Sequence, residues 1–185
     1  MAQGKGSVLF RAVDGIDAAV DRVGRAGSWL ILGIVATLFL QIPMREFVHY
    51  GHREVNDFGQ TIHAAVFMIG ASYALRWNAH VRVDIFYHRM SERQRALVDL
   101  CGTLFLILPW LFIVTRDSIP IVVHSVLELE AFAETYTPGY FILRSQLLVF
   151  AVLLAAQCLA NILRDLATLL GHERPGASRG HPGHA

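Results

Sequence analysis

The sequence has few charged residues and few cysteines for its length. Charged residues make up 17% of its 185 positions, below the roughly 25% that is usual in soluble domains. Cys101 and Cys158 both lie inside apolar stretches and form no CxxC pair, so we expect them to behave as small buried hydrophobic side chains. With 54% hydrophobic residues and a mean hydropathy of +0.44, the composition indicates a small integral membrane protein.

The motifs of common enzyme chemistry are also missing. The sequence contains no GxSxG, no HExxH and no phosphate-binding glycine loop. It has no deep, polar, broken helix of the kind that forms a transporter's substrate site. We therefore expect no catalysis, no cofactor and no metal site. The histidines near the C-terminus match no ligand motif: His172, His181 and His184.

Four apolar runs are present, at residues 28–44, 58–75, 97–115 and 140–163. About 20 helical residues cross a bilayer, and only helices satisfy their own backbone groups in lipid, so we expect an all-α protein with four transmembrane helices. A charged segment precedes the first run and no small-x-small pattern follows it, so we expect an uncleaved anchor. A shorter apolar stretch, 119–129, either extends the third helix or lies along the surface.

The ends of the chain differ from its middle. Residues 1–27 have the spacing of an amphipathic helix, which predicts an arm in the membrane interface; the alternative is a solvated helix that packs on a partner. Residues 28–166 form the predicted four-helix transmembrane domain. Residues 167–185, rich in Gly, Pro and His, are expected to be disordered. The predicted apolar face of the N-terminal helix consists of Leu9, Val13, Ile16, Val20 and Val23.

Lysine and arginine are distributed unevenly between the segments that join the runs. The two termini and the loop between the second and third runs hold twelve, whereas the other two loops hold three. The positive-inside rule therefore predicts that both termini are cytoplasmic. The twelve are Lys5, Arg11, Arg22, Arg25, Arg76, Arg82, Arg89, Arg93, Arg95, Arg164, Arg174 and Arg179; the three are Arg45, Arg53 and Arg116.

Some polar residues within or beside the runs suggest specific interactions. His63 and His124 would both lie toward the non-cytoplasmic side, so a haem-binding membrane anchor of a redox complex is an alternative function. Arg144 lies within about one turn of a membrane interface, which favours anchoring or a subunit contact. Three further side chains fit hydrogen bonds between helices: Gln41, Gln157 and Asn161.

Residues 72–109 resemble the signature region of the small-permease (Q) subunit of tripartite ATP-independent periplasmic (TRAP) transporters. The resemblance rests on HVRVD at 80–84, the aromatic pair Phe86 and Tyr87, the turn at 91–96 and the start of the third run. It implies a bacterial inner-membrane subunit without catalytic activity. Such a subunit braces the scaffold of a large sodium-coupled elevator subunit and takes part in uptake of a small organic acid or related solute.

The resemblance also implies partners: the large permease subunit, membrane lipids and a periplasmic substrate-binding protein. At the cytoplasmic turn, alternate residues of an extended segment share a face, so we expect His80, Arg82 and Asp84 to fix the turn or contact the partner subunit. Relatives often carry acidic residues before an aromatic at the outer end of the second span, where this chain has Asn56 and Asp57. Three acids of the last loop are candidates to dock the binding protein instead: Glu128, Glu130 and Glu134.

Overall fold

The computed structural model describes residues 2–49, 51–77 and 90–171, with side chains from Phe10 onward apart from that of residue 52. Within these ranges the chain is helical apart from turns and one isolated β-bridge between Ala131 and Pro138, which confirms the all-α prediction. The helices are α1 (Ala2–Ser28), α2 (Leu30–Pro43), α3 (His52–Arg76), α5 (Glu92–Gly102), α6 (Leu108–Leu127) and α7 (Tyr140–Leu169), with π-helical turns η1 (Met44–Val48) and η2 (Thr103–Ile107).

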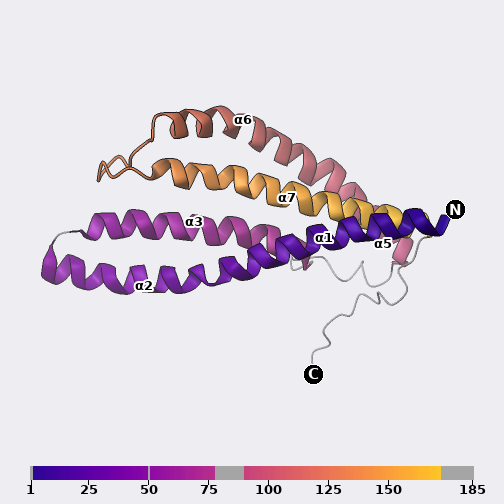
Figure 1. The fold of residues 1–185 in the computed structure, drawn as a ribbon, viewed down its shortest axis with the longest axis horizontal. Helices are drawn as coiled ribbons and strands as arrows, with labels where there is room; N and C mark the ends of the chain where they lie inside the picture. Colours follow the sequence, from indigo (N-terminus) through magenta and orange to yellow (C-terminus); the bar gives the residue numbers. More distant parts are fainter. Residues whose placement is uncertain (1, 50, 78–89, 172–185) are drawn as a thin grey trace, which may run out of the picture.

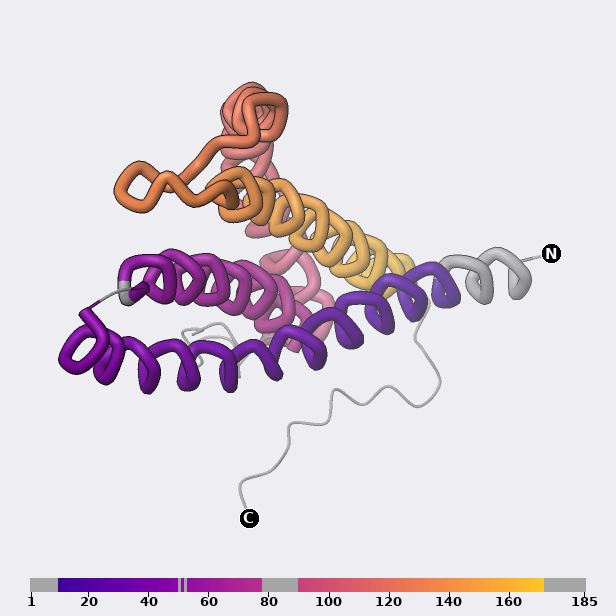
Figure 2. Tube along the Cα trace, turned by 60° about the vertical axis from the view of Figure 1, so that its left-hand side comes forward, coloured from indigo at the N-terminus to yellow at the C-terminus, as the bar shows by residue number. Residues whose placement is uncertain are grey.

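The long helices form a row rather than a closed bundle (Figure 1). Helix α2 packs on α3, α3 packs on α7, and α7 packs on α6. Helix α1 continues almost directly from α2 and packs against both α3 and α7 at the end of the row nearest the N-terminus (Figure 2). The hairpin of α2 with α3 and the hairpin of α6 with α7 therefore meet through α3 and α7, and α1 joins them at one end.

The predicted N-terminal helix is present, and its apolar residues cover the row. Val13 and Val20 are 2% and 3% exposed, and Ile16 and Val23 are half-buried. A one-residue break at Trp29 separates α1 from α2. Around it, the amides of Trp29 and Leu32 donate to carbonyls three residues earlier, which tightens the helix without turning it sharply.

Three helical stretches are long and apolar enough to cross a membrane: Phe10–Val48, Glu92–Leu127 and Tyr140–Leu169. They contain the first, third and fourth predicted spans. Helix α3, the second predicted span, is not among them, because its apolar run 58–75 also holds polar residues such as Gln60 and His63, which lower its mean hydropathy. Its 25 residues would still extend about 37 Å at 1.5 Å per residue.

The stretch 119–129 extends the third helix, because α6 continues without a break to Leu127. The whole stretch Glu92–Leu127 has 36 residues, about 54 Å of helix, which exceeds the roughly 30 Å hydrocarbon layer. Ser91 is the N-cap of this stretch: the amide of Gln94 donates to Ser91 Oγ (3.4 Å), and the Ser91 amide donates to Gln94 Oε1 (2.9 Å).

Both π-helical turns lie beside a proline. Pro43 ends α2 just before η1, and Pro109 follows η2 by two residues. Proline lacks the amide hydrogen that an α-helix needs, and the backbone adjusts nearby. At η2 the amide of Leu108 therefore donates to the carbonyl of Thr103, five residues earlier.

The apolar core is small and lies where α3, α6 and α7 meet. It consists of Leu75, Leu111, Ala151, Leu154 and Cys158, with Phe150 packed against it. The thiol of Cys158 is thus buried as predicted. The prediction is wrong for Cys101, which is exposed, because it lies on a side of α5 that no other described helix covers.

Small residues allow the helix running through α1 and α2 to approach α3 closely. A Cβ atom added at Gly27 would lie 2.8 Å from Cγ2 of Ile69, and one added at Gly33 would lie 3.2 Å from Cδ1 of Ile62. A Cβ at Gly24 would overlap the ring of Tyr73. Helices in membranes associate by close packing of this kind, because lipid removes the hydrophobic drive to associate.

We predict that Gly24→Ala destabilises the chain whereas Gly15→Ala does not. Alanine favours a helix over glycine by up to about 1 kcal/mol, but at position 24 the methyl group overlaps the Tyr73 ring, an overpacking that costs about 1–3 kcal/mol. Position 15 of the same helix has open space. Thermal unfolding in detergent should give a lower melting temperature for Gly24→Ala alone. Equal melting temperatures for the two variants would show that α1 does not contact α3 closely.

Candidate functional site

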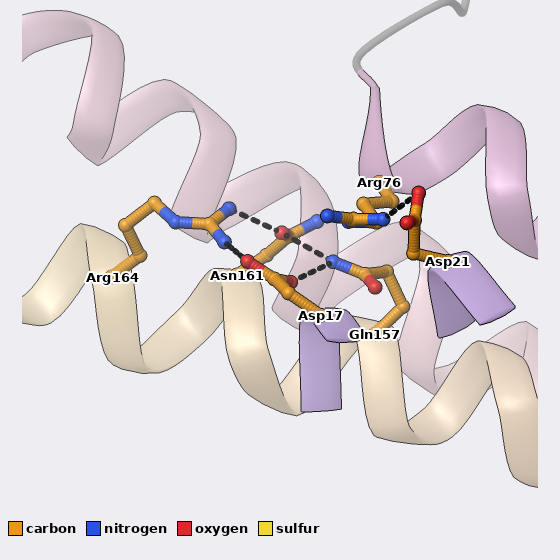
Figure 3. Close-up of polar contacts among 6 residues, drawn as sticks. All are labelled: Asp17, Asp21, Arg76, Gln157, Asn161 and Arg164. Atoms are coloured by element: carbon orange, nitrogen blue, oxygen red, sulfur yellow. Dashed lines mark hydrogen bonds and ion pairs between the residues drawn. The ribbon is translucent and has the colours of Figure 1, made fainter. Parts of the chain in front are cut away.

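Polar side chains form a cluster where α1 crosses α7 (Figure 3). Both carboxylate oxygens of Asp17 are bonded: Oδ2 accepts from Arg164 Nη2 at 2.6 Å, and Oδ1 accepts from Gln157 Nε2 at 3.2 Å. The Asp17 side chain is 17% exposed and Gln157 is fully buried. A carboxylate that has lost most of its water needs such partners.

The Asn161 amide sets the positions of both donors. Its Oδ1 accepts from Gln157 Nε2 at 3.3 Å and from Arg164 Nη1 at 3.0 Å. The three residues lie three and four positions apart on α7 and therefore share one face of the helix. The prediction of a bond between helices is confirmed for Gln157, whereas these two bonds of Asn161 stay within α7. Gln41 of α2 also bonds another helix, through Asn56 Oδ1 of α3 at 3.4 Å.

Asp21, one turn further along α1, joins that helix to α3. Its Oδ1 forms an ion pair with Nη1 of Arg76, and its Oδ2 lies 2.6 Å from Nη2 of Arg25. The Arg76 guanidinium also lies 5.1 Å from the ring centroid of Trp77. Asp17 and Asp21 thus fasten α1 to α7 and α3 respectively. We call these six residues and Arg25 the inner cluster: Asp17, Asp21, Arg25, Arg76, Gln157, Asn161 and Arg164.

A second set of polar contacts orders the loop between α6 and α7, at the opposite end of the row. Glu130 Oε2 lies 2.6 Å from Arg144 Nη1, and the Glu130 carbonyl accepts from the amides of Gly139 and Phe141, each at 3.4 Å. Thr135 Oγ1 donates to Asp57 Oδ2 of α3 at 2.6 Å, which ties the loop to the other hairpin. We call these the outer contacts.

Comparison with known families identifies the family of this chain. A family model described as "Tripartite ATP-independent periplasmic transporters, DctQ component" matches residues 34–168, well over half of the chain. The chain belongs to the DctQ family. It is therefore a small, non-catalytic, multi-pass membrane component of a TRAP transporter. No curated protein and no solved structure matches the chain.

The three acids that were predicted to dock a binding protein lie in different environments in this DctQ component. Glu130 turns inward to Arg144, so its side chain orders the loop. Glu128 is 63% exposed and lies 3.1 Å from His124 Nε2. Glu134 is exposed. The structure therefore leaves Glu128 and Glu134, but not Glu130, on the surface of the loop.

The other predicted site lies elsewhere in the DctQ chain. His80, Arg82 and Asp84 lie outside the described residues, so their expected roles stay predictions. The inner cluster was not predicted as a unit. Its arginines, Arg25, Arg76 and Arg164, were counted only as orientation signals. The acidic residues on the polar side of the N-terminal helix were the signal that could have revealed their partners.

The histidines behind the haem alternative are both on the surface of this DctQ chain. His63 is exposed on α3, and His124, 69% exposed, pairs with Glu128. Within the ranges that the structure describes, no group of three or more His, Cys, Asp and Glu side chains is arranged to hold a metal ion. Family membership, rather than this arrangement, decides in favour of the transporter component.

We predict that Asp17 and Arg164 are energetically coupled. Asp17→Asn and Arg164→Gln should each lower the free energy of unfolding by about 1–2 kcal/mol, because each leaves a partly buried partner without its charge-assisted bond. The double variant should lose less than the sum by about 1 kcal/mol. Chemical denaturation in detergent measures all three.

Glu46→Gln provides the control, because Glu46 pairs with Arg45 on the surface, where their side chains are 55% and 71% exposed. Exposed pairs contribute little, so this variant should resemble the wild type. Strict additivity of Asp17→Asn and Arg164→Gln would contradict the coupling.

Proposed function

We propose that this DctQ component crosses the membrane four times and braces the scaffold of the transporter's large subunit. The observation that supports this role is the shape of the row, which is one helix thick with apolar side chains exposed along its length. One broad side of such a row suits lipid, and the other suits a partner within the membrane. Strongly exposed examples are Trp29, Phe39, Ile42, Phe47, Phe67, Phe105 and Phe112.

Helix α3 is the second of the four proposed spans. Its packing along α2 and the end of α1 supports this, since Gln41 of α2 bonds Asn56 near one end of α3 and Gly27 of α1 faces Ile69 near the other. A helix that lies between two spanning neighbours need not be strongly apolar, because α2 and α7 cover much of its surface. Lys and Arg are in excess in the two termini and in the loop between the second and third spans. This excess supports cytoplasmic termini in a bacterial inner membrane.

The proposed domain division keeps residues 1–27 as an arm, 28–166 as the transmembrane domain and 167–185 as a tail. The inner cluster gives the arm a specific task. Asp17 and Asp21 hold α1 against α7 and α3, so the arm fixes the distance between the two hairpins at the cytoplasmic end. A constant distance between the hairpins would give the large subunit a rigid support while its transport part moves.

The remaining parts of the proposal come from the family. The large subunit would move its substrate by a sodium-coupled elevator motion, and a periplasmic binding protein would deliver a small organic acid or related solute. His80, Arg82 and Asp84 would fix the turn between the second and third spans or contact the large subunit. Glu128 and Glu134 would face the binding protein, with Glu130 and Arg144 keeping their loop in shape.

Assembly with the large subunit tests this function. We predict that Arg82→Ala lowers co-purification of the large subunit by about tenfold, the effect of losing one charge-assisted hydrogen bond. Uptake into proteoliposomes that contain the large subunit and binding protein should fall in parallel. Arg93→Ala is the matched control, since Arg93 is exposed in the first turn of α5. Two results would refute the bracing role. One is uptake that does not change when this chain is left out, and the other is uptake by this chain alone.

The loop between α6 and α7 makes a separate prediction about the binding protein. Replacing both Glu128 and Glu134 by Gln should slow association about threefold at low salt and have little effect at high salt, because exposed charges act mainly through screened attraction. Glu130→Gln should instead lower the melting temperature, since Arg144 loses its partner. The association rates of the binding protein would be measured on surface-immobilised transporter at two ionic strengths. Unchanged low-salt association of the double variant would mean that these acids do not dock the binding protein.

A further inference from the structure

A small groove lies where the end of α1 and the start of α2 pass over α3. Its volume is about 160 Å³, similar to the roughly 150 Å³ of an engineered apolar cavity that binds benzene. It therefore has room for a segment of an alkyl chain. Its lining residues are Gly24, Arg25, Gly27, Ser28, Ile31, Val66, Ile69, Gly70 and Tyr73.

The groove exists because side chains are missing at particular positions. At Gly70 an added Cβ would meet no atom within 4 Å, so this glycine opens onto empty space. Gly24 and Gly27 differ, because an added Cβ there would strike Tyr73 and Ile69. The two glycines of α1 therefore bring the helices together, whereas Gly70 leaves the space beside them open.

The groove has an apolar part and a basic part. Ile31, Val66 and Ile69 line the part toward the middle of the row. Arg25 lines the other part, with its side chain 69% exposed, and Arg22, one turn earlier on α1, is also exposed. Asp21 is the acid beside them, and its second oxygen is already paired with Arg76. Arg25 and Arg76 both pair with this one aspartate, so with Arg22 one turn away this end of the groove carries net positive charge.

Aromatic side chains flank the groove, since Trp29 directly follows Ser28 and Trp77 lies one turn beyond Tyr73. Trp29 and Trp77 are 73% and 59% exposed, and Tyr73 lies 6.2 Å from Trp77 between ring centroids. Tryptophan and tyrosine concentrate where the hydrocarbon layer meets the headgroups. A ligand of this groove would thus have its apolar part in the hydrocarbon and its charged part among the headgroups.

We propose that the groove binds an anionic phospholipid, with part of one acyl chain beside Gly70 and Ile69 and the phosphate at Arg25. The apolar lining and the positive charge match the two chemically different parts of such a lipid. The proposal requires only that the chain lies in a membrane, and it does not depend on the bracing role.

Lipid retention by the full-length chain, purified in mild detergent and stripped of native lipid, tests the proposal. Native mass spectrometry and thermal unfolding would be run with dioleoyl phosphatidylglycerol, with the zwitterionic dioleoyl phosphatidylcholine and with inorganic phosphate. Phosphatidylglycerol should be retained and should raise the melting temperature. Phosphatidylcholine should bind about fivefold more weakly, and phosphate alone should have no effect.

Two variants and a control locate the binding. A Cβ atom at Gly70 meets no atom within 4 Å, so Gly70→Leu adds its side chain beside the groove and should weaken phosphatidylglycerol binding by about tenfold or more. Arg25→Gln should reduce it to the level of phosphatidylcholine. Gly15→Leu, also in open space but about two and a half turns from Gly24 along α1, should bind like the wild type.

Three results would overturn the proposal. The first is equal retention of phosphatidylglycerol by the wild type and Gly70→Leu. The second is an effect of inorganic phosphate as large as that of the lipid, which would identify an anion site instead. The third is loss of the bound lipid whenever the large subunit co-purifies, which would assign the groove to a side chain of that subunit.

Discussion

Two aspartates of one helix hold the two halves of this molecule together at one end. Asp17 bonds Arg164 and Gln157 of α7, and Asp21 pairs with Arg76 of α3. Both carboxylates are mostly withdrawn from water, so separation of α1 from the row would take their carboxylate partners from Arg76, Arg164 and the buried Gln157 amide. The energetic cost of unpaired charge therefore fixes where α1 lies, and α1 in turn fixes how the hairpins meet.

The rest of the row has little core to stabilise it. The buried apolar cluster is confined to the meeting point of α3, α6 and α7, and many large side chains of α2 and α6 are about half exposed or more. Along the hairpin of α2 and α3, close contacts at small residues, such as that of Gly33 with Ile62, compensate for the small core. Such a molecule is stable in surroundings that cover its apolar sides, which a membrane and a large partner subunit both provide.

Local features of the fold could be predicted well because they depend on nearby residues. The helix after Ser91 begins where a capping serine and Gln94 lie three apart, and α7 begins at Tyr140, directly after Pro138 and Gly139. Long-range features could not be predicted. The periodicity of residues 1–27 identified an apolar face, but it carries no information on which distant helices cover that face or which arginines meet Asp17 and Asp21.

The acidic loop shows the same limit of local reasoning. Glu128, Glu130 and Glu134 looked alike in the sequence, yet Glu130 turns inward. The backbone explains this, because Leu129 and Tyr136 adopt left-handed conformations, with φ of 48° and 56°, that redirect the chain on either side of it. Such conformations are uncommon for these residues, and no sequence pattern predicts them.

The single-layer arrangement of helices has a mechanical consequence. A sheet of rods side by side bends readily about an axis parallel to the rods, because only the seams between neighbours have to flex. It resists shear and stretching within its plane, since these would slide whole helices past one another. Because α1 crosses the seam between α3 and α7 at one end, the row should bend least there and should bend more easily toward the other end, where α2 and α6 diverge (Figure 1).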